Sequence, residues 1–248
     1  MSTKTPRRTI DLNADLGEGY AYDEALMQLV SSANVSTGVY TDAPAAPREA
    51  LLLAKRYSVV VGCHPGYPDP GEFGRKSISW TLEEAFGSIS EQVIAFRQLC
   101  EEVGIRCRYI KPHGALYHDA GQVVVIQKAL GTVARLHQLP VLHYPDSPLA
   151  RIVDAPAVFA EGFAERRYQE KGILVSRSTP NATIHDPIVA SEQAVLLARG
   201  EPIPTRAGPQ RMPVDSICVH GDAPAALDIL KATRQGLEND GFAIASFL

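Results

Sequence analysis

The 248-residue sequence lacks long apolar runs and any excess of basic residues. No stretch approaches the roughly 20 apolar residues of a membrane-spanning helix, and the N-terminal segment has no apolar core of the kind found in signal peptides. Twenty-four basic residues stand against 28 acidic ones, giving a net charge of −4. We therefore expect a cytoplasmic protein that binds a small molecule and neither nucleic acid nor a membrane.

Cysteine is scarce, and three common catalytic motifs are missing. The four cysteines have no CxxC spacing and stand mostly in apolar or helical surroundings, so we expect buried, reduced thiols. The loop at 66–77 fails as a Walker A phosphate loop, because Arg75 separates Gly74 from Lys76. The sequence has neither a GxSxG nucleophile elbow nor an HExxH metal helix. It therefore shows no ATP site of its own.

Short β-branched runs alternate with helical patterns along the chain. Strands are expected at 9–13, 33–40, 57–63, 106–111, 139–144, 155–161 and 215–220. Helices are expected at 44–56, 82–103, 122–137, 187–199 and 223–238. A capping box at 81–84 begins the second helix and Gly104 ends it, whereas the Pro- and Gly-rich segment 201–213 predicts a long loop or a flap over the site. The pattern predicts one α/β domain over 1–248, built on a parallel sheet or barrel of seven strands.

Polar residues follow the ends of several predicted strands. In β/α barrels these ends meet on one rim, where catalytic groups lie. The residues concerned are Asp11, Asn13, Asp15 and Glu18 of the first strand and its loop, His64, Tyr67 and Asp69 after the third, Lys111 and His113 after the fourth, and His220 and Asp222 after the last. We therefore place a candidate site on this rim, with Lys111-Pro112-His113 at its centre.

The acidic members of this set leave alternatives open. Asp222 stands just before a helical run, where an aspartate caps a helix N-terminus as readily as it orients a neighbouring histidine. Asp15 and Glu18 suit a turn and a first helical turn as well as a site. Asp11 and Asn13 alternate to one face of an apolar strand, which favours a functional role over a turn.

The basic members indicate carbonyl or anion chemistry. His64 and His113 each end an apolar strand and precede a glycine by no more than two residues, which argues against ordinary core histidines. Lys111 is expected to point into the barrel mouth, where it polarises a carbonyl or holds an anion. The segments 163–168 and 174–177 add arginines, Arg177 among them, that suit a carboxylate clamp, although surface arginines are commoner.

Several segments, taken together, resemble the LamB/YcsF family. They are DLNADLGE, SSANVSTG, GCHPGYPDPGEFGRK, RYIKPHGALY, FAERRY, ILVSR and ICVHGD, and the match runs from about residue 9 to 224. The resemblance implies an irregular seven-stranded β/α barrel of the glycoside hydrolase/deacetylase type. It also implies the activity of the 5-oxoprolinase A subunit, a hydrolase that opens 5-oxoproline or a related lactam to glutamate.

The resemblance implies roles for individual residues and for partners. Expected catalytic residues are Asp11 or Asp15 as base or water-orienting group, Lys111 and His113 as carbonyl or phosphate contacts, and His64 as a second acid or base. Expected substrate-binding residues are Asn13, Glu18, Asn34, Tyr40, Tyr67, Asp69, Tyr117, Arg177, His220 and Asp222. ATP would be a co-substrate bound by the 5-oxoprolinase B and C subunits rather than by this chain. Whether the protein binds a divalent metal ion and whether it forms a homo-oligomer stay open.

The loop after the second strand departs from the family. Where the family typically reads IACGFHAGDP, this chain reads VSTGVYTDAP, so Thr37 replaces a cysteine, Tyr40 a histidine and Ala43 an aspartate. Two other functions therefore stay open. One is a metal-dependent, deacetylase-like amidohydrolase that uses a carboxylate and two histidines around one ion. The other is a catalytically impaired paralogue that only binds a ligand.

Overall fold

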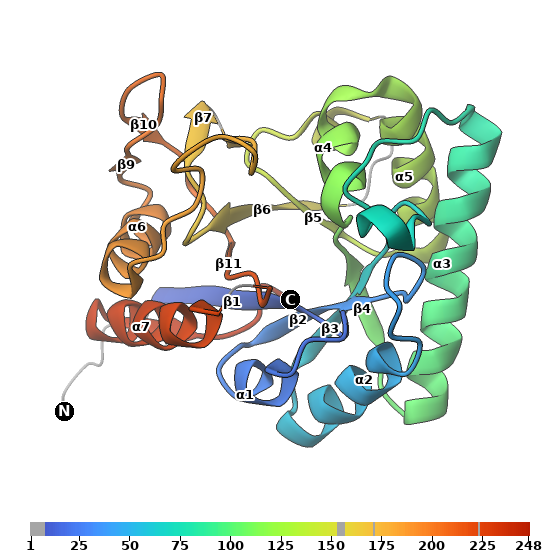
Figure 1. The fold of residues 1–248 in the computed structure, drawn as a ribbon, viewed down its shortest axis with the longest axis horizontal. Coiled ribbons are helices and arrows are strands. Elements are labelled where there is room, and N and C mark those ends of the chain that lie inside the picture. Colours follow the sequence, from blue (N-terminus) through green and yellow to red (C-terminus); the bar gives the residue numbers. More distant parts are fainter. Residues whose placement is uncertain (1–7, 153–156, 171, 223) are drawn as a thin grey trace, which may run out of the picture.

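A closed barrel of parallel strands forms the centre of the computed structural model, which describes residues 8–152, 157–170, 172–222 and 224–248. Its strands are β1 (Arg8–Leu16), β2 (Ser32–Ser36), β3 (Val60–His64), β4 (Cys107–Ile110), β5 (Val141–His143), β6 (Val158–Phe163) and β11 (Ser216–Cys218). Each strand pairs with the next in this order, and β11 pairs with β1, which closes the ring (Figure 1). The predicted seven-stranded β/α barrel is confirmed.

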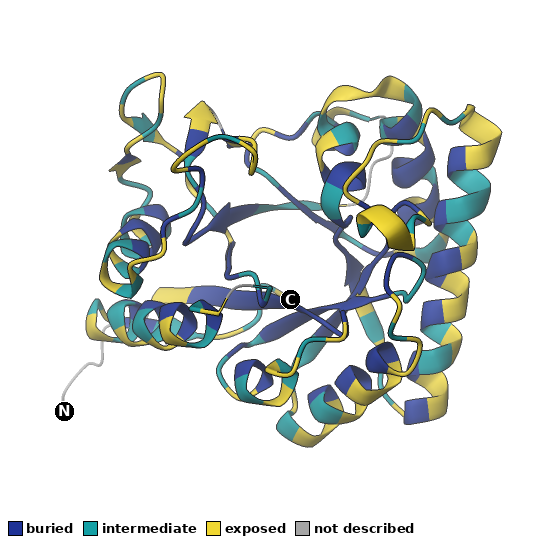
Figure 2. Cartoon of the chain, in the orientation of Figure 1, coloured by how far each residue is buried: buried dark blue, intermediate teal, exposed yellow. Residues whose placement is uncertain are grey.

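Helices surround the barrel and bury one face each against it (Figure 2). They are α1 (Asp23–Met27), α2 (Ala46–Tyr57), α3 (Leu82–Val103), α4 (Gly114–Gln122), α5 (Val124–His137), α6 (Pro187–Arg199) and α7 (Ala226–Asn239). The predicted capping box of α3 is present, since Thr81 and Glu84 each bond the other's backbone N–H. Gly104 ends this helix in the left-handed conformation, with φ of 81°. No helix of the described residues is long and apolar enough to cross a membrane.

Several elements differ from the sequence-based expectation. Helices α1 and α4 were not predicted, and neither were β12 (Phe242–Ile244), the antiparallel pair β7 (Tyr168–Glu170) and β8 (Ile173–Leu174), and the pair β9 (Pro202–Ile203) and β10 (Gln210–Arg211). The last pair lies within 201–213, and no residue of this segment lines the pocket at the C-terminal ends of the barrel strands, so the segment does not cover that pocket in this structure. Residues 155–156 of a predicted strand and 223 of a predicted helix lie outside the described residues.

The barrel interior is polar, because alternate residues of each strand face opposite sides. On β1, Leu12 and Leu16 belong to the hydrophobic core between barrel and helices, whereas Asn13 bonds side chains inside the barrel. On β4, Tyr109 crosses the interior, and it needs Gly62 on β3 because a Cβ there would stand 2.2 Å from the Tyr109 ring. The C-terminal segment packs against Tyr109, and the ring centroid of Phe247 lies 5.1 Å from that of Tyr109.

Candidate active site

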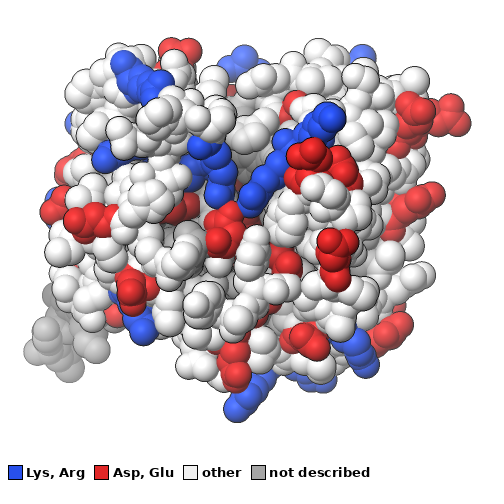
Figure 3. Space-filling model, viewed as in Figure 1, with Lys and Arg blue, Asp and Glu red and all other residues white. Residues whose placement is uncertain are grey.

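A pocket of about 350 Å³ opens at the C-terminal ends of the barrel strands. It brings together many of the predicted site residues, namely Asp15, Glu18, His64, Lys111, His113, Tyr117, Arg177, His220 and Asp222. Arg75, Arg166 and Phe163 also line it. Figure 3 shows basic and acidic side chains gathered around a hollow near the centre of the molecular face. The pocket volume lies within the range of small-molecule sites.

A buried lysine between two carboxylates forms the floor of the pocket. The side chain of Lys111 is 2% exposed, and its Nζ lies 2.8 Å from Asp15 Oδ1 and 2.9 Å from Glu161 Oε1. Burial would lower the pKa of Lys111, but Asp15, Cys218 and Glu161 hold it well above its ordinary value. Burial would raise the pKa of Asp15, but Lys111 and His64 hold it well below the ordinary value. The Lys111–Asp15 pair is therefore charged at neutral pH.

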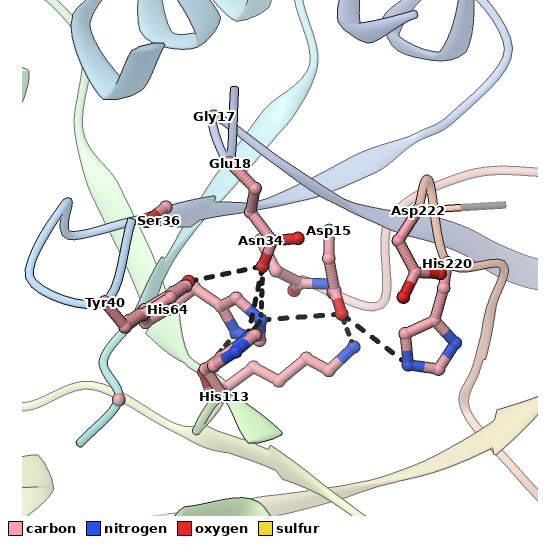
Figure 4. A network of polar contacts seen from close by, with 12 residues as sticks. Asp15, Gly17, Glu18, Asn34, Ser36, Tyr40, His64, His113, His220 and Asp222 are labelled. Carbon is pink, nitrogen blue, oxygen red and sulfur yellow. Dashed lines mark hydrogen bonds and ion pairs between the residues drawn. The ribbon is translucent and has the colours of Figure 1, made fainter. Parts of the chain in front are cut away.

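Two histidines turn one ring nitrogen each toward the same point (Figure 4). His64 Nδ1 lies 2.7 Å from the backbone oxygen of Lys111, and His113 Nε2 lies 2.9 Å from that of Phe73. Because a carbonyl oxygen only accepts, each of these nitrogens carries a proton and donates it. The opposite nitrogens, His64 Nε2 and His113 Nδ1, are 3.1 Å apart, and His113 Nδ1 is also 3.1 Å from Glu18 Oε1. Three acceptors this close require a shared proton or a cation between them.

Two groups of side chains have the composition of a metal site. Glu18, His64 and His113 are all buried and place their ligand atoms within 4.8 Å of one another, as do Asp15, Cys218 and His220. In the second group Lys111 already supplies a cation, 2.8 Å from Asp15 and 3.2 Å from Cys218. The first group fits a divalent ion better, because metal-binding histidines commonly donate their other N–H to a backbone carbonyl.

Tyr40 lies behind the histidines and does not line the pocket. Its ring stacks on that of His113, with centroids 3.8 Å apart and planes 5° from parallel. Its hydroxyl lies 3.3 Å from the backbone oxygen of His64 and 3.4 Å from Glu18 Oε1. Burial and the charge of Glu18 raise the pKa of Tyr40 well above its ordinary value, so the phenol is protonated. It fixes the orientation of His113.

His220 approaches Asp15 from the opposite side of the pocket. Its Nε2 lies 3.8 Å from Asp15 Oδ2, its Nδ1 bonds the carboxylate of Glu165, and its ring stacks on Phe163 with centroids 5.2 Å apart. Burial would raise the pKa of Glu165, but His220 lowers it below its ordinary value. An ionised Glu165 therefore holds His220 in one orientation.

Asp222 joins two arginines at the mouth of the pocket. Its Oδ2 accepts hydrogen bonds from Arg75 at 2.7 Å and from Arg177 at 2.8 Å. Although burial raises the pKa of Asp222, His220 and the two arginines lower it below its ordinary value. The interpretation of Asp222 as a helix cap is wrong, because Ala225 is the N-cap of α7 and no side chain caps that helix.

Other predicted site residues lie below the pocket or outside it. The Asn34 amide donates to Asp15 at 2.8 Å and to Asn13 at 2.7 Å, and Asn13 donates to Ser216 at 2.7 Å, so both asparagines support Asp15 from beneath. Asp11 lies one layer deeper, where its carboxylate accepts hydrogen bonds from the hydroxyls of Ser31, Ser32 and Ser216. Burial raises its pKa to about 6. The catalytic role expected of Asp11 does not suit this position, four residues before Asp15 on the same strand.

Tyr67 and Asp69 follow β3 but turn away from the pocket. The Tyr67 hydroxyl donates to Asp119 at 2.7 Å, and its ring lies 4.6 Å from that of Trp80. Asp69 accepts a hydrogen bond from the backbone N–H of Glu72 and caps the short helix Pro70–Glu72. Neither residue lines the pocket, and both stabilise the loop after β3.

Several residues that build the site were not among those predicted, Glu161, Glu165 and Arg75 among them. Glu161 is fully buried and pairs with Lys111, and its signal was a glutamate within an otherwise apolar strand, as for Asp11. Arg75 lines the pocket, and its only signal was its place within the loop 66–77 that was tested as a phosphate cradle. Arg166, also on the pocket wall, stood in a segment considered for a carboxylate clamp.

Comparisons with known proteins agree on one family. The sequence profile of the LamB/YcsF family matches residues 10–248. The 5-oxoprolinase A subunit of Azorhizobium caulinodans is 38% identical over 259 residues, which cover 96% of this chain and 98% of that protein. The lactam utilization protein from Thermus thermophilus has a crystal structure that superposes with a TM-score of 0.88 at 31% identity, covering 96% of this chain and 99% of the other. A family 4 carbohydrate esterase from Streptomyces lividans shares the fold alone, with a TM-score of 0.53 and 8% identity over 96% of this chain and 91% of that one. The chain belongs to the LamB/YcsF family.

Proposed function

We propose that this protein is the lactam-hydrolysing subunit of a 5-oxoprolinase, acting on 5-oxoproline or a related cyclic amide. Its relatives bear the name of the 5-oxoprolinase A subunit and cover nearly the whole chain. The observation that carries the proposal is the pocket floor, where Asp15 lies between the Lys111 ammonium and the paired imidazoles of His64 and His113. This arrangement suits attack by water on an amide carbonyl.

The proposed chemistry begins outside this chain. An unstrained lactam carbonyl is a poor electrophile, and ATP-dependent phosphorylation of its oxygen by B and C subunits would make the ring carbon susceptible to water. No Walker A loop is present in this sequence, which suits that division of labour. The tasks left to this pocket are to hold the ring, to take a proton from water and to stabilise the charge that develops.

His64 is the proposed base. Its Nδ1 donates to a backbone carbonyl, so Nε2 is the nitrogen that accepts a proton, in the state in which the proton shared within the Glu18, His64 and His113 group resides on Glu18 or His113. Asp15 Oδ2 lies 3.4 Å from this nitrogen and stabilises the imidazolium that forms when His64 takes a proton. Lys111, held at 2.8 Å from the other oxygen of Asp15, supplies the fixed positive charge for the carbonyl or phosphate oxygen. His220 stands on the far side of Asp15 and can protonate the ring nitrogen as the C–N bond breaks, which leaves an acyl phosphate that a second water hydrolyses to glutamate and phosphate.

Reconstitution tests this proposal. The purified chain is mixed with B and C subunits, ATP and 5-oxoproline, and glutamate release is measured. Wild type should release glutamate, Lys111→Met and His113→Ala should abolish release once circular dichroism shows that they are folded, and the exposed-site control Lys128→Met should retain it. Full activity in both site variants would contradict the assignment. A formed complex that binds the lactam and releases no glutamate would instead favour a catalytically impaired paralogue.

A metal-dependent amidohydrolase is the second candidate, favoured by the Glu18, His64 and His113 group. These three side chains would hold a divalent ion, which would supply a water of lowered pKa as nucleophile. Elemental analysis of the purified protein decides between the candidates. One equivalent of zinc or another transition metal, lost in a Glu18→Gln variant, would support the metallohydrolase, and a metal-free protein that releases glutamate would exclude it.

A further inference from the structure

Three arginines line the pocket, and they differ in how their charge is balanced. Arg75 and Arg177 both donate to Asp222, and their side chains are 43% and 37% exposed. Their charges are therefore shared with a carboxylate of the protein itself and screened by solvent. Arg166 is only 4% exposed, and none of the described residues forms an ion pair with it. Its neighbour Glu165 bonds His220 instead.

The guanidinium of Arg166 has unused hydrogen-bonding capacity. One terminal nitrogen donates to the backbone oxygen of Val175 at 2.8 Å, whereas Nε, which is buried, has no partner among the described residues. A buried donor left unpaired and a buried charge left uncompensated are both unfavourable. Burial and the nearby charge of Arg177 lower the pKa of Arg166 below its ordinary value, although the charges of Glu165 and Asp222 act in the opposite direction.

The backbone at Arg166 is firmly held. Its carbonyl oxygen accepts a hydrogen bond from Gln193 at 2.9 Å, and the residue forms an antiparallel bridge with Thr183. The side chain therefore starts from a fixed point on the wall. A guanidinium presents parallel N–H donors that match the two oxygens of a carboxylate.

We propose that Arg166 binds the carboxylate of the substrate and thereby restricts the pocket to lactams that carry one. This assignment rests on the proposed function and adds the group that selects the substrate. A carboxylate from the ligand neutralises the buried guanidinium, with which no described residue forms an ion pair. A lactam without a carboxylate leaves this charge unbalanced, so it binds more weakly.

Binding of two lactams tests this role. The ligands are 5-oxoproline and 2-pyrrolidinone, which have the same ring with and without the carboxylate, and dissociation constants are measured by calorimetry on the full chain. Wild type should bind 5-oxoproline at least about tenfold more tightly. Arg166→Gln should lose this preference while its affinity for 2-pyrrolidinone stays the same. Arg167→Gln, the adjacent arginine outside the pocket lining, should keep the preference.

The possible outcomes separate this inference from the proposed function. Wild type that binds neither lactam would overturn both. Wild type that prefers 5-oxoproline, together with an Arg166→Gln variant that keeps the preference or weakens both ligands equally, would overturn the role of Arg166 alone. If circular dichroism shows that Arg166→Gln is unfolded, Arg166→Lys replaces it in the test, because lysine retains the charge without the paired N–H donors of a guanidinium. The Arg166→Lys variant should lose most of the preference for 5-oxoproline, and a variant that keeps the full preference would overturn the inference.

Discussion

Replacing Lys111 by methionine should destabilise the protein strongly, because it leaves Asp15 and Glu161 buried without their shared cation. Removing one partner of a buried ion pair typically costs about 3–5 kcal/mol. Methionine has nearly the length of lysine, so little cavity is created and the loss comes mainly from charge. Lys128→Met, on the exposed face of α5, makes the same chemical change and should alter stability by less than about 0.5 kcal/mol.

The loss should depend on pH with a definite sign. The pKa of Asp15 is held well below its ordinary value, so its stabilising contribution is present above the unfolded pKa of about 3.9 and is lost as pH falls through the lower folded pKa. The raised pKa of Lys111 gives a contribution present below the unfolded pKa of about 10.4 and lost as pH rises through the higher folded pKa. Between pH values of about 4 and about 10, wild type therefore keeps the stabilising contributions of both Asp15 and Lys111.

In the Lys111→Met variant burial of Asp15 is no longer opposed by its ammonium partner. Its carboxyl then tends to hold a proton in the folded state, so the variant should lose stability as pH rises above about 4. The difference between wild type and variant should therefore be larger at pH 7.5 than at pH 5. Urea denaturation at both pH values measures it. An equal loss at the two pH values, or a loss no larger than that of Lys128→Met, would refute the reasoning.

Two further perturbations concern the barrel interior. Because burial raises the pKa of Asp11 from 3.8 to about 6, the free energy of unfolding of wild type should fall as pH rises from about 4 to 6. A pKa shift of this size corresponds to about 3 kcal/mol. Asp11→Asn should remove this fall, which urea denaturation measures. Gly62→Ala should cost about 1–3 kcal/mol, since its Cβ would overlap the Tyr109 ring. By contrast Gly87→Ala, with nothing within 4 Å of its Cβ, should raise the melting temperature, and equal effects of the two alanines would contradict the packing argument.

The barrel strands were predictable because β-branched runs recur between amphipathic helices. The elements that escaped prediction have weak local signals. Helix α4 starts at Gly114, immediately after the rim motif, and contains Gly121, both poor helix formers. Strand β12 has three residues and forms by pairing with Arg8–Ile10 at the other end of the chain. Such elements are determined by tertiary contacts that a local pattern does not contain.

Depth along a strand separates the site residues that were predictable from those that were not. Asp11 and Asp15 share one face of β1, but only Asp15 lies close to the end of the strand and reaches the pocket. Glu161 was missed because the strand was expected to end there, whereas β6 continues to Phe163 and places Glu161 inside the barrel. Its ion pair with Lys111 joins β6 to β4 across the interior, and no sequence spacing shows such a contact.

The altered loop after β2 is packed in a way that preserves the neighbouring acid–base group. Thr37 donates a hydrogen bond to Gln92 at 2.9 Å. Ala43 packs closely against Gly19, because a Cβ on Gly19 would stand 2.7 Å from the methyl group of Ala43. Tyr40 is fully buried and stacks on His113. With tyrosine at this position, His64 and His113 each keep a hydrogen bond to a backbone carbonyl. The stacked Tyr40 ring limits the rotation of His113, so a chain with tyrosine at this position still holds the Glu18, His64 and His113 group together.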